Sequence, residues 1–322
     1  MITRRTLLAA AGAAVAWSSQ PLRAQGAYPN RPIRILVPAG AGGSGDITAR
    51  LFGKYLEDAW KAGVVVENKP GANGLIATEY VWKQPNDGYT LGIASGSTHA
   101  AAPYLFKKLP YDPLKDFEHI GLIGVLGSVA LVPASSPFQS LKEMVAYSKA
   151  NPGKVFFGHF NTSSQVPGEM LKSVGQLPIQ GVSYKTIANA ITDLIGGQIQ
   201  MMFVDYVAAA AHIEAGKVRP IAVTEAKRNS RLPTVPAVAE MYPGYEIMAF
   251  LGLYAPPGTP APIVARVNRA LRDAIATPAI HTRLGSLGLT LRDYSPEDYR
   301  AFVAREIENW ATYAKVAKIE PQ

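Results

Sequence analysis

The sequence predicts an α/β protein built from two lobes with a ligand cleft between them. Three observations support this. First, apolar runs typical of strands alternate with amphipathic segments typical of helices along most of the chain, which favours parallel strands joined by crossover helices. Second, the 322 residues exceed what one hydrophobic core usually supports. Third, 48% of the residues are hydrophobic and only 17% are charged, as in a well-packed globular protein.

The first 24 residues have the pattern of an export signal. Arg4 and Arg5 precede an apolar run over residues 7–17, which is about half of the roughly 20 residues that a membrane span needs. The segment then leads to Ala24, after which we expect cleavage. The letters "TRRTLL" are typical of a twin-arginine signal, although a general secretory signal can also carry two arginines. We therefore expect an exported, periplasmic protein.

The charge and the cysteine content exclude several classes of site. The formal charge of +8 falls to +5 without the three arginines of the signal, Arg4, Arg5 and Arg23. The remaining basic residues are scattered, so we expect no nucleic-acid partner. A mild positive field suits a small anionic ligand. The chain contains no cysteine, which excludes disulfides, thiolate metal sites and thiol nucleophiles.

The first elements predict a strand over residues 28–38 and a helix over residues 45–60. Apolar residues recur along the helix at helical spacing, and Asp46 in its first turn is placed to cap backbone N–H groups. Beyond it we expect a strand at 64–67, a helix at 75–84 and a strand at 89–95, separated by the turns "NKPGANG" and "PNDG".

The middle of the chain repeats this alternation. Strands are expected at 129–133, 154–160, 179–185, 199–205 and 218–224. Helices are expected at 140–153, 187–197 and 208–217, and the stretch 161–175 should be a loop followed by a helix that begins near "PGEMLKSVG". The proline-rich stretch 227–244 should form a long ordered loop.

The chain then returns to a strand at 247–256 and ends in helices at 260–276 and 295–315. This order places lobe I at residues 26–128 plus 250–322 and lobe II at residues 129–249. The two strand crossings between the lobes would form a hinge. A cleft between two such lobes is where ligands bind and where closure can trap them.

A glycine-rich turn follows the first strand. Gly40, Gly42 and Gly45 form the pattern G-x-G-x-x-G, and Glu67 ends the next strand about twenty residues further on, which is the layout of a dinucleotide-binding site. An exported NAD(P)-dependent oxidoreductase is therefore one hypothesis. The other is that backbone N–H groups at a helix N-terminus hold a different anion without a cofactor.

No common catalytic or metal-binding motif accompanies this turn. None of the five histidines pairs at i, i+4 with another, so the H-E-x-x-H metal motif is absent, and so is the G-x-S-x-G nucleophile elbow. Asp46 stands where a phosphate-binding loop needs lysine. We therefore expect no catalytic residue, no metal and no cofactor.

A series of motifs favours the second hypothesis. The segments "YPNRPIRILVP", "GGSGDITAR", "VVVENKPGANG", "DLIGGQIQMMF", "HIEAGKVRPIAVT" and "GLYAPPGTP" occur in this order within residues 28–318. This series resembles the periplasmic solute-binding proteins of tripartite tricarboxylate transporters, the Bug or TctC family.

The resemblance implies a two-lobed periplasmic binding protein fold of the type II-like kind and no enzymatic activity. It implies that the chain captures a small carboxylate, either a di- or tricarboxylate or an aromatic acid, and that permease subunits in the membrane are its partners. We expect a monomer. A carboxylate sensor that signals to a membrane kinase would share the site but not the partner.

The resemblance also places candidate ligand contacts in lobe I. They lie in the glycine-rich loop and at the end of the third strand: Ala39, Gly40, Ala41, Gly42, Gly43, Ser95, Gly96 and Ser97. The N–H groups of Gly42 and Gly43 would meet a carboxylate at the start of the following helix. Ala39 stands where the family commonly has phenylalanine, which leaves room for a larger ligand.

In lobe II, "FGHFNTSSQVPGE" corresponds to a loop of the family that is rich in small residues. The candidates here are His159, Asn161, Thr162, Ser163 and Ser164, whose hydroxyl and N–H groups would suit a second carboxylate at a helix N-terminus. His159 and Asn161 depart from the family pattern and predict an altered pocket. Asp205 ends the strand at 199–205, where it either caps the next helix or faces an ammonium or hydroxyl group of the ligand.

Overall fold

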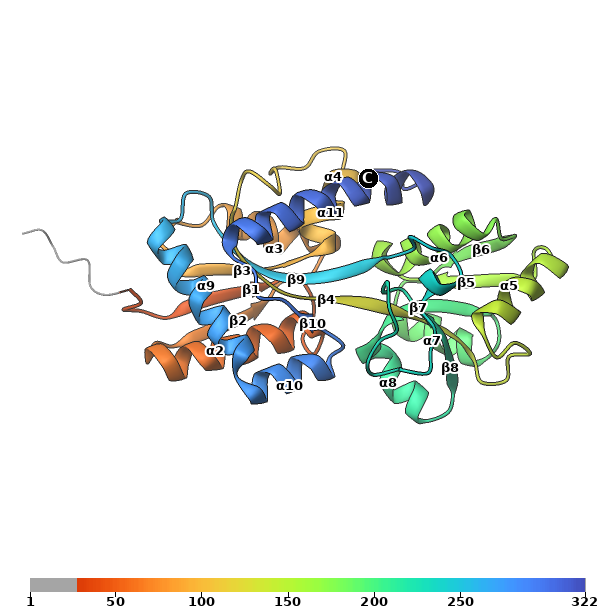
Figure 1. The fold of residues 1–322 in the computed structure, drawn as a ribbon. Helices are drawn as coiled ribbons and strands as arrows, with labels where there is room; N and C mark the ends of the chain where they lie inside the picture. The colour runs from red at the N-terminus through yellow and green to blue at the C-terminus, as the bar shows by residue number, and fades with distance from the viewer. Residues whose placement is uncertain (1–27, 322) are drawn as a thin grey trace, which may run out of the picture.

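Two long strands run through both halves of the molecule. The computed structural model describes residues 28–321, so the expected signal peptide at residues 1–24 lies outside the described residues. At the centre, β4 (Glu118–Pro133) pairs antiparallel with β9 (Met248–Ala255) (Figure 1). With its 16 residues, β4 is roughly 50 Å long, enough to serve both halves. The strands follow the order β2-β1-β3-β9-β4-β7-β5-β6, with β8 and β10 paired to β4.

Lobe I is the half that contains the beginning and the end of the described chain. Its strands are β1 (Ile33–Val37), β2 (Val64–Asn68), β3 (Thr90–Ser95) and β10 (Thr290–Leu291). Its helices are α2 (Ser44–Trp60), η1 (Ala72–Gly74), α3 (Leu75–Trp82), η2 (Ser97–Ala101), α4 (Ala102–Leu105), α9 (Ala261–Ala276), α10 (Pro278–Ser286) and α11 (Pro296–Val316). β1 pairs in parallel with β2 and β3, as the alternation of strands and helices predicted.

Lobe II is formed by the middle of the chain. Its strands are β5 (Val155–His159), β6 (Ile179–Ser183), β7 (Met201–Asp205) and β8 (Val218–Val223). Its helices are α5 (Leu141–Ala150), α6 (Thr162–Gly175), α7 (Ile187–Ile195), α8 (Tyr206–Glu214) and η3 (Val238–Glu240). β5 is parallel to β6 and β7, whereas β4 is antiparallel to β7 and β8.

The central strand β4 is much longer than the strand predicted at residues 129–133. Its first part contains Gly121, Gly124 and Gly127, which resemble turn residues when only the sequence is known. In the structure each of these glycines lets a neighbour approach the strand. A Cβ at Gly127, for example, would overlap the carboxyl group of Glu225. The glycines therefore permit close packing across the centre, and the strand continues through them.

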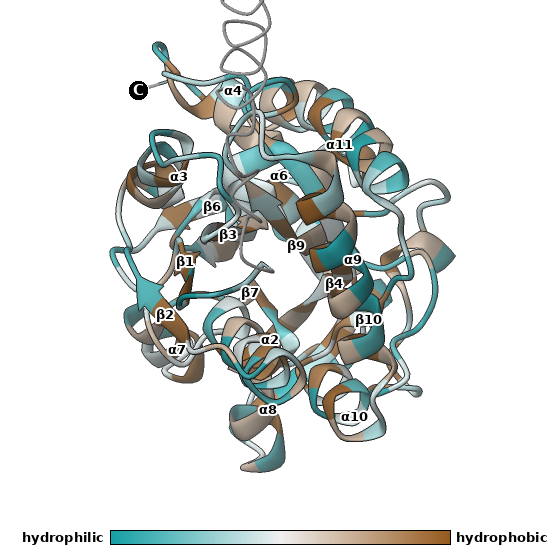
Figure 2. Ribbon diagram, turned by 90° about the vertical axis from the view of Figure 1, so that its left-hand side faces the viewer, coloured by the Kyte–Doolittle hydropathy of each residue, from teal (hydrophilic) through white to brown (hydrophobic). Residues whose placement is uncertain are grey.

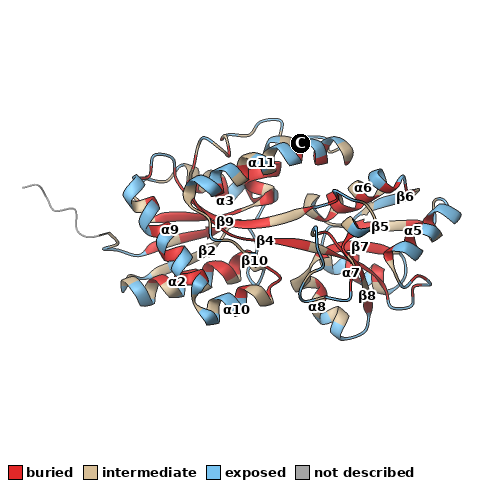
Figure 3. Ribbon diagram, viewed as in Figure 1, coloured by how far each residue is buried: buried red, intermediate tan, exposed pale blue. Residues whose placement is uncertain are grey.

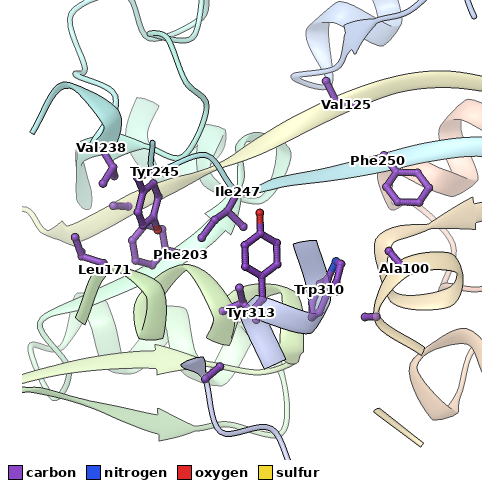
Figure 4. Packing of buried hydrophobic residues seen from close by; sticks show 14 of the residues in the cluster. Ala100, Val125, Leu171, Phe203, Val238, Tyr245, Ile247, Phe250, Trp310 and Tyr313 are labelled. Carbon is purple, nitrogen blue, oxygen red and sulfur yellow. The ribbon is translucent and has the colours of Figure 1, made fainter. Parts of the chain in front are cut away.

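Helix α11 joins the two lobes on one side of the central strands. It packs against β4 and η2 in lobe I and against α6 in lobe II. Trp310 and Tyr313 of this helix belong with Ile247 to the shared apolar core, and Tyr313 points toward Ile247 (Figure 4). The Tyr313 hydroxyl donates a hydrogen bond to the Glu246 carbonyl oxygen at 3.1 Å. The C-terminal helix therefore adds a third connection to the two that β4 and β9 provide.

The strands are buried between half-exposed helices. β4 and β9 are largely buried along their length, whereas the outer helices show one exposed side (Figure 3). The same helices carry both hydrophilic and hydrophobic residues (Figure 2), as expected when one face of a helix packs on a sheet. Among residues 28–321, no helix has the length and apolar character that crossing a membrane requires.

Candidate ligand-binding cleft

A cavity of about 400 Å³ lies between the lobes beside β4 and β9. In lobe I it is lined by the segments that follow β1 and β3, and in lobe II by the segments that follow β5 and β7. The carboxyl ends of parallel strands lie at one edge of a sheet, so these segments meet at facing edges. Residues 126–128 of β4 and 249–251 of β9 form the floor. We call this cavity the cleft.

Most of the predicted ligand residues line the cleft. These are Ala39, Gly43, Ser95, Gly96, Ser97, Asn161, Ser163, Ser164 and Asp205. The lining does not include Gly40, Ala41, Gly42, His159 or Thr162. The sequence therefore located the four segments that meet at the cleft but did not resolve which residues of each segment face it.

Helix α2 begins at the cleft without a side chain to cap it. Its N-cap residue is Gly43, which has an extended backbone (φ −76°, ψ 168°). The first backbone bond of the helix runs from the Ile47 N–H to the Gly43 carbonyl oxygen at 3.0 Å. The N–H groups of Ser44 and Gly45 therefore precede the helical bonding pattern, and both residues line the cleft. This end of α2 is suited to an anion because it has unpaired N–H groups and the positive end of the helix dipole.

The Gly42 N–H does not face the cleft, contrary to the prediction for this loop. It donates a 2.9 Å hydrogen bond to Oδ2 of Asp46, whose other oxygen lies 2.9 Å from the Arg50 guanidinium. Burial alone would raise the pKa of Asp46, but the hydrogen bonds from Arg50 and Gly42 outweigh burial and lower this pKa. Asp46 thus ties the loop to the first turn of α2, and the Gly42 N–H is already used.

The turn after β3 brings hydroxyl groups to the same wall. Ser95 and Ser97 line the cleft on either side of Gly96, where the chain enters the single π-helical turn η2. Thr98 turns inward instead: its hydroxyl accepts a 3.0 Å hydrogen bond from the Ser95 N–H and lies 2.9 Å from Nδ1 of the fully buried His99. The inward-facing residues fix the turn and leave the two serines at the cleft.

Helix α6 begins earlier than predicted, and its first turn caps itself. Asn161 is the N-cap, and its Oδ1 accepts a 2.9 Å hydrogen bond from the Ser164 N–H. The Ser164 hydroxyl accepts hydrogen bonds from the N–H groups of Phe160 and Asn161 and donates to the Asn161 carbonyl oxygen. This reciprocal capping box explains why the helix begins at Thr162 rather than after a loop.

The three hydroxyl residues of this turn consequently differ in what their side chains can offer a ligand. Ser163 lines the cleft, and its hydroxyl takes no part in the capping box. Ser164 also borders the cleft, but it is buried and its hydroxyl is used in the cap. Thr162 lines a separate hollow with Gln165 and Lys318. Successive residues of a helix are about 100° apart, so the three could not all face one ligand once the helix starts at Thr162.

His159 is half-buried and lies beside Phe157, with ring centroids 6.1 Å apart. Burial lowers its pKa, although the Glu169 carboxylate opposes this effect. The side chain thus packs within lobe II and does not line the cleft.

Asp205 caps the next helix, which is one of the two roles that the sequence left open. As the N-cap residue of α8, it accepts a 2.9 Å hydrogen bond from the Ala208 N–H at Oδ1. It also lines the cleft, at the end of β7 and directly opposite Ser128 on β4.

Of the apolar part of the lining, the sequence indicated only Phe160, which stands where the family commonly has a small residue. Phe160, Phe203 and Phe250 come from three different segments, and Leu126 and Leu251 complete the floor. The others appear as ordinary core positions in strands, and Leu126, Phe250 and Leu251 reach the cleft because β4 and β9 pass between the lobes. Asn73 also lines it, from the turn before α3.

The acidic residue of the dinucleotide pattern is already paired. Both carboxylate oxygens of Glu67 accept hydrogen bonds from the Arg34 guanidinium, at 2.9 and 2.8 Å. The hydrogen bonds from Arg34 lower the pKa of Glu67. In a dinucleotide site this carboxylate would be available to a ribose hydroxyl, whereas here a bidentate ion pair occupies it.

The charge of the cleft is unusual for an anion site. Among the described residues that line it, Asp205 is the one charged side chain, and the lining contains no arginine, lysine or histidine. Positive potential must therefore come from backbone N–H groups and helix N-termini. A larger hollow of about 820 Å³ contains Lys227, Arg231 and Arg292, but it lies between α10 and the loop after β8 rather than at these helix ends.

Comparison with known sequences gives a consistent set of matches. Residues 49–318 match the family described as "Tripartite tricarboxylate transporter family receptor". A protein encoded in the tcbD-tcbE intergenic region of Pseudomonas sp. (strain P51) is 33% identical over 315 residues, which cover 96% of this chain and 93% of the relative. Protein BugT of Bordetella pertussis is 33% identical over 290 residues, which cover 88% of each chain.

Solved structures match over almost the whole chain as well. An R. palustris protein with adipate is 32% identical with a TM-score of 0.83, covering 92% of this chain and 100% of that one. The periplasmic binding protein BugD is 33% identical with a TM-score of 0.79 and the same coverage. MatC from Rhodopseudomonas palustris with bound malate is 30% identical with a TM-score of 0.77, covering 89% of this chain and 99% of that one.

Proposed function

Because this chain belongs to the tripartite tricarboxylate transporter family of receptors, we propose that it captures a small carboxylate in the periplasm and delivers it to a membrane permease. The structures of two relatives contain short dicarboxylates, adipate in one and malate in the other. We propose that it acts as a monomeric receptor without enzymatic activity, and that the mature chain begins after Ala24.

The observation that carries this proposal is the uncapped N-terminus of α2 at the cleft. The N–H groups of Ser44 and Gly45 lie ahead of the helical bonding pattern at a wall that also carries the hydroxyl groups of Ser95 and Ser97. A carboxylate accepts several hydrogen bonds at once, so it can use all of these donors. Hydrogen bonds to a charged acceptor contribute about 1.5–3 kcal/mol each.

The remaining contacts would come from the other lobe. We propose that Asn161, Ser163 and Asp205 contact the ligand from lobe II, while Gly43 and Ser95–Ser97 contact it from lobe I. The proposed lobes are residues 26–128 plus 250–322 and residues 129–249, joined by β4 and β9. Since contacts from both walls form together only when the lobes approach, binding should favour the closed form.

The oxidoreductase hypothesis loses its main support, because Arg34 occupies the carboxylate of Glu67. A sensor that works with a membrane kinase would use the same cleft and differ only in its partner.

Thermal unfolding of the mature protein tests the proposed function. The panel contains succinate, malate, adipate and their amino derivatives, with benzoate as an aromatic acid and NADP as the competing ligand. A ligand at one hundred times its Kd stabilises the protein by about 2.7 kcal/mol, which raises the Tm measurably. The proposal fails if no carboxylate raises the Tm, and a shift with NADP alone would restore the oxidoreductase hypothesis.

A further inference from the structure

The single charged side chain of the cleft lining is a carboxylate, in a site proposed for carboxylates. Asp205 is contributed by lobe II, and the described lining holds no basic side chain to balance it. A simple dicarboxylate would bring two more negative charges into this space. Burying uncompensated like charges together is unfavourable, so the lining is a poor match for a ligand whose only polar groups are carboxylates.

The position of Asp205 leaves part of its carboxylate for a ligand. Its Oδ1 caps α8 through the Ala208 N–H at 2.9 Å. The residue is only half-buried and faces the cleft. Ser128, the residue in register with it on β4, lines the cleft as well. The backbone N–H of Ser128 donates to the Thr224 hydroxyl at 2.7 Å, so its strand position is fixed. A carboxylate and a hydroxyl group thus stand side by side as acceptors at the end of β7.

From these observations we infer that the natural ligand is an amino-substituted carboxylate, and that Asp205 selects it by accepting a hydrogen bond from the ligand's ammonium group. This inference rests on the proposed function, because the ligand's carboxylate is assigned to the N-terminus of α2. The two ends of the cleft then have complementary polarity: backbone donors in lobe I and carboxylate and hydroxyl acceptors in lobe II.

An ammonium group satisfies this arrangement better than a hydroxyl group. Both can donate a hydrogen bond to Asp205, but only the ammonium group carries a charge that balances the carboxylate. It also has three donors, so it can bond to Asp205 and to the Ser128 hydroxyl together. Charge-assisted hydrogen bonds of this kind are about twice as strong as neutral ones.

Ligands that differ only in one substituent separate the contribution of that substituent to the affinity from the contribution of the carboxylates. Calorimetry with succinate, malate and aspartate compares a hydrogen, a hydroxyl and an ammonium group on one carbon skeleton, and adipate with 2-aminoadipate repeats the comparison on a longer one. In at least one series we expect the amino acid to bind at least tenfold more tightly than its parent, a difference of about 1.4 kcal/mol. An advantage of the amino acid below tenfold in both series would overturn the inference.

The variant Asp205→Asn removes the charge and keeps the cap, because asparagine is as good an N-cap residue as aspartate. It should weaken the amino acid at least tenfold and leave the parent dicarboxylate unchanged or more tightly bound. Asp205→Ser also keeps an N-cap residue and should have the same effects on affinity, so it replaces Asp205→Asn if that variant folds poorly. The matched control is Asp112→Asn, which alters a carboxylate that caps the Leu114 N–H away from the cleft and should change neither affinity.

The outcomes distinguish this inference from the proposed function. If the dicarboxylates bind but the amino acids bind no more tightly than their parents, to the wild-type protein and to the Asp205 variants alike, only the inference about Asp205 is overturned. If none of the five probes binds the wild-type protein, the inference is overturned, whereas the proposed function is overturned only if no carboxylate of the thermal-unfolding panel binds either.

Discussion

Replacing Gly43 by aspartate should separate the stability of the protein from its ability to bind a carboxylate. Gly43 is the N-cap of α2 and has an extended backbone that any residue can adopt. A Cβ there would meet only the Gly40 carbonyl oxygen, at 3.8 Å. The new side chain therefore fits without strain, and it is a preferred N-cap that can accept the N–H groups of the first turn.

The expected changes follow from this geometry. Aspartate in place of glycine at an N-cap adds a few tenths of a kcal/mol to the stability, and Asp46 in the same turn keeps the gain small. The carboxylate of the new aspartate accepts hydrogen bonds from N–H groups that we assign to the ligand. Each hydrogen bond that the ligand loses should weaken its binding by about 1.5–3 kcal/mol. The new carboxylate also repels the ligand's charge, by about 4 kcal/mol for charges 4 Å apart at an effective dielectric constant of 20. We expect the affinity to fall at least a hundredfold.

The assay combines calorimetry with thermal unfolding in the absence of ligand, using the carboxylate that gives the largest Tm shift in the panel. Gly43→Asn is the matched control, because it caps equally well without a charge and should lose only about tenfold in affinity. Unchanged affinity in Gly43→Asp, with the Tm kept or raised, would refute the assignment of the carboxylate to α2. Equal losses in both variants would mean that the ligand's charge does not lie near Gly43.

Three further predictions concern the cap of α6, the buried His119 of lobe I and the motion of the lobes. Ser164→Ala should lower the free energy of unfolding by about 1–2 kcal/mol, because it breaks the capping box. Ser163→Ala should leave the free energy of unfolding unchanged and lower the affinity for the carboxylate. Urea unfolding measures the first quantity and calorimetry the second, and a loss of stability in Ser163→Ala with a loss of affinity in Ser164→Ala would contradict the prediction. Burial lowers the pKa of His119 to about 4 from the ordinary 6.5, so the unfolded chain binds this proton more readily and stability should fall between about pH 6.5 and 4, by up to about 3 kcal/mol. His119→Phe should flatten this dependence, and parallel unfolding curves for variant and wild type would contradict the assignment. Small-angle scattering should show a smaller radius of gyration with saturating carboxylate, and identical values in both states would count against closure.

The sequence predicted the alternation of strands and helices well, because periodic apolar residues and glycine or proline turns are local signals. It failed where the structure depends on contacts between distant segments. The glycines of β4 resemble breaks in a strand until the groups packed over them are known. The π-helical turn η2 and the short strand β10 likewise lack a periodic pattern long enough to detect.

The prediction of the cleft was limited in the same way. The sequence identified the segments that end β1, β3, β5 and β7, because strand ends followed by glycine- or serine-rich turns mark such edges. It could not tell that Asp46 takes the Gly42 N–H or that Ser164 closes a capping box, since both depend on side-chain conformations. It also could not place the apolar floor, which exists only because β4 and β9 cross between the lobes.

The helices α2, α6 and α8 begin at the cleft with different N-terminal caps, and this difference explains how two lobes of similar construction can contribute differently to ligand binding. Helix α2 has no side-chain cap, so a carboxylate can reach its N–H groups without displacing anything. At α6 and α8, Asn161 and Asp205 already occupy N–H groups of the first turn. A carboxylate entering the open cleft therefore gains most from lobe I and should bind there first. Lobe II offers a hydroxyl group from Ser163 and the acceptor oxygens of Asp205, which reward particular substituents rather than negative charge as such. Capture would then depend on lobe I and selection on lobe II, with closure around β4 and β9 bringing the two steps together.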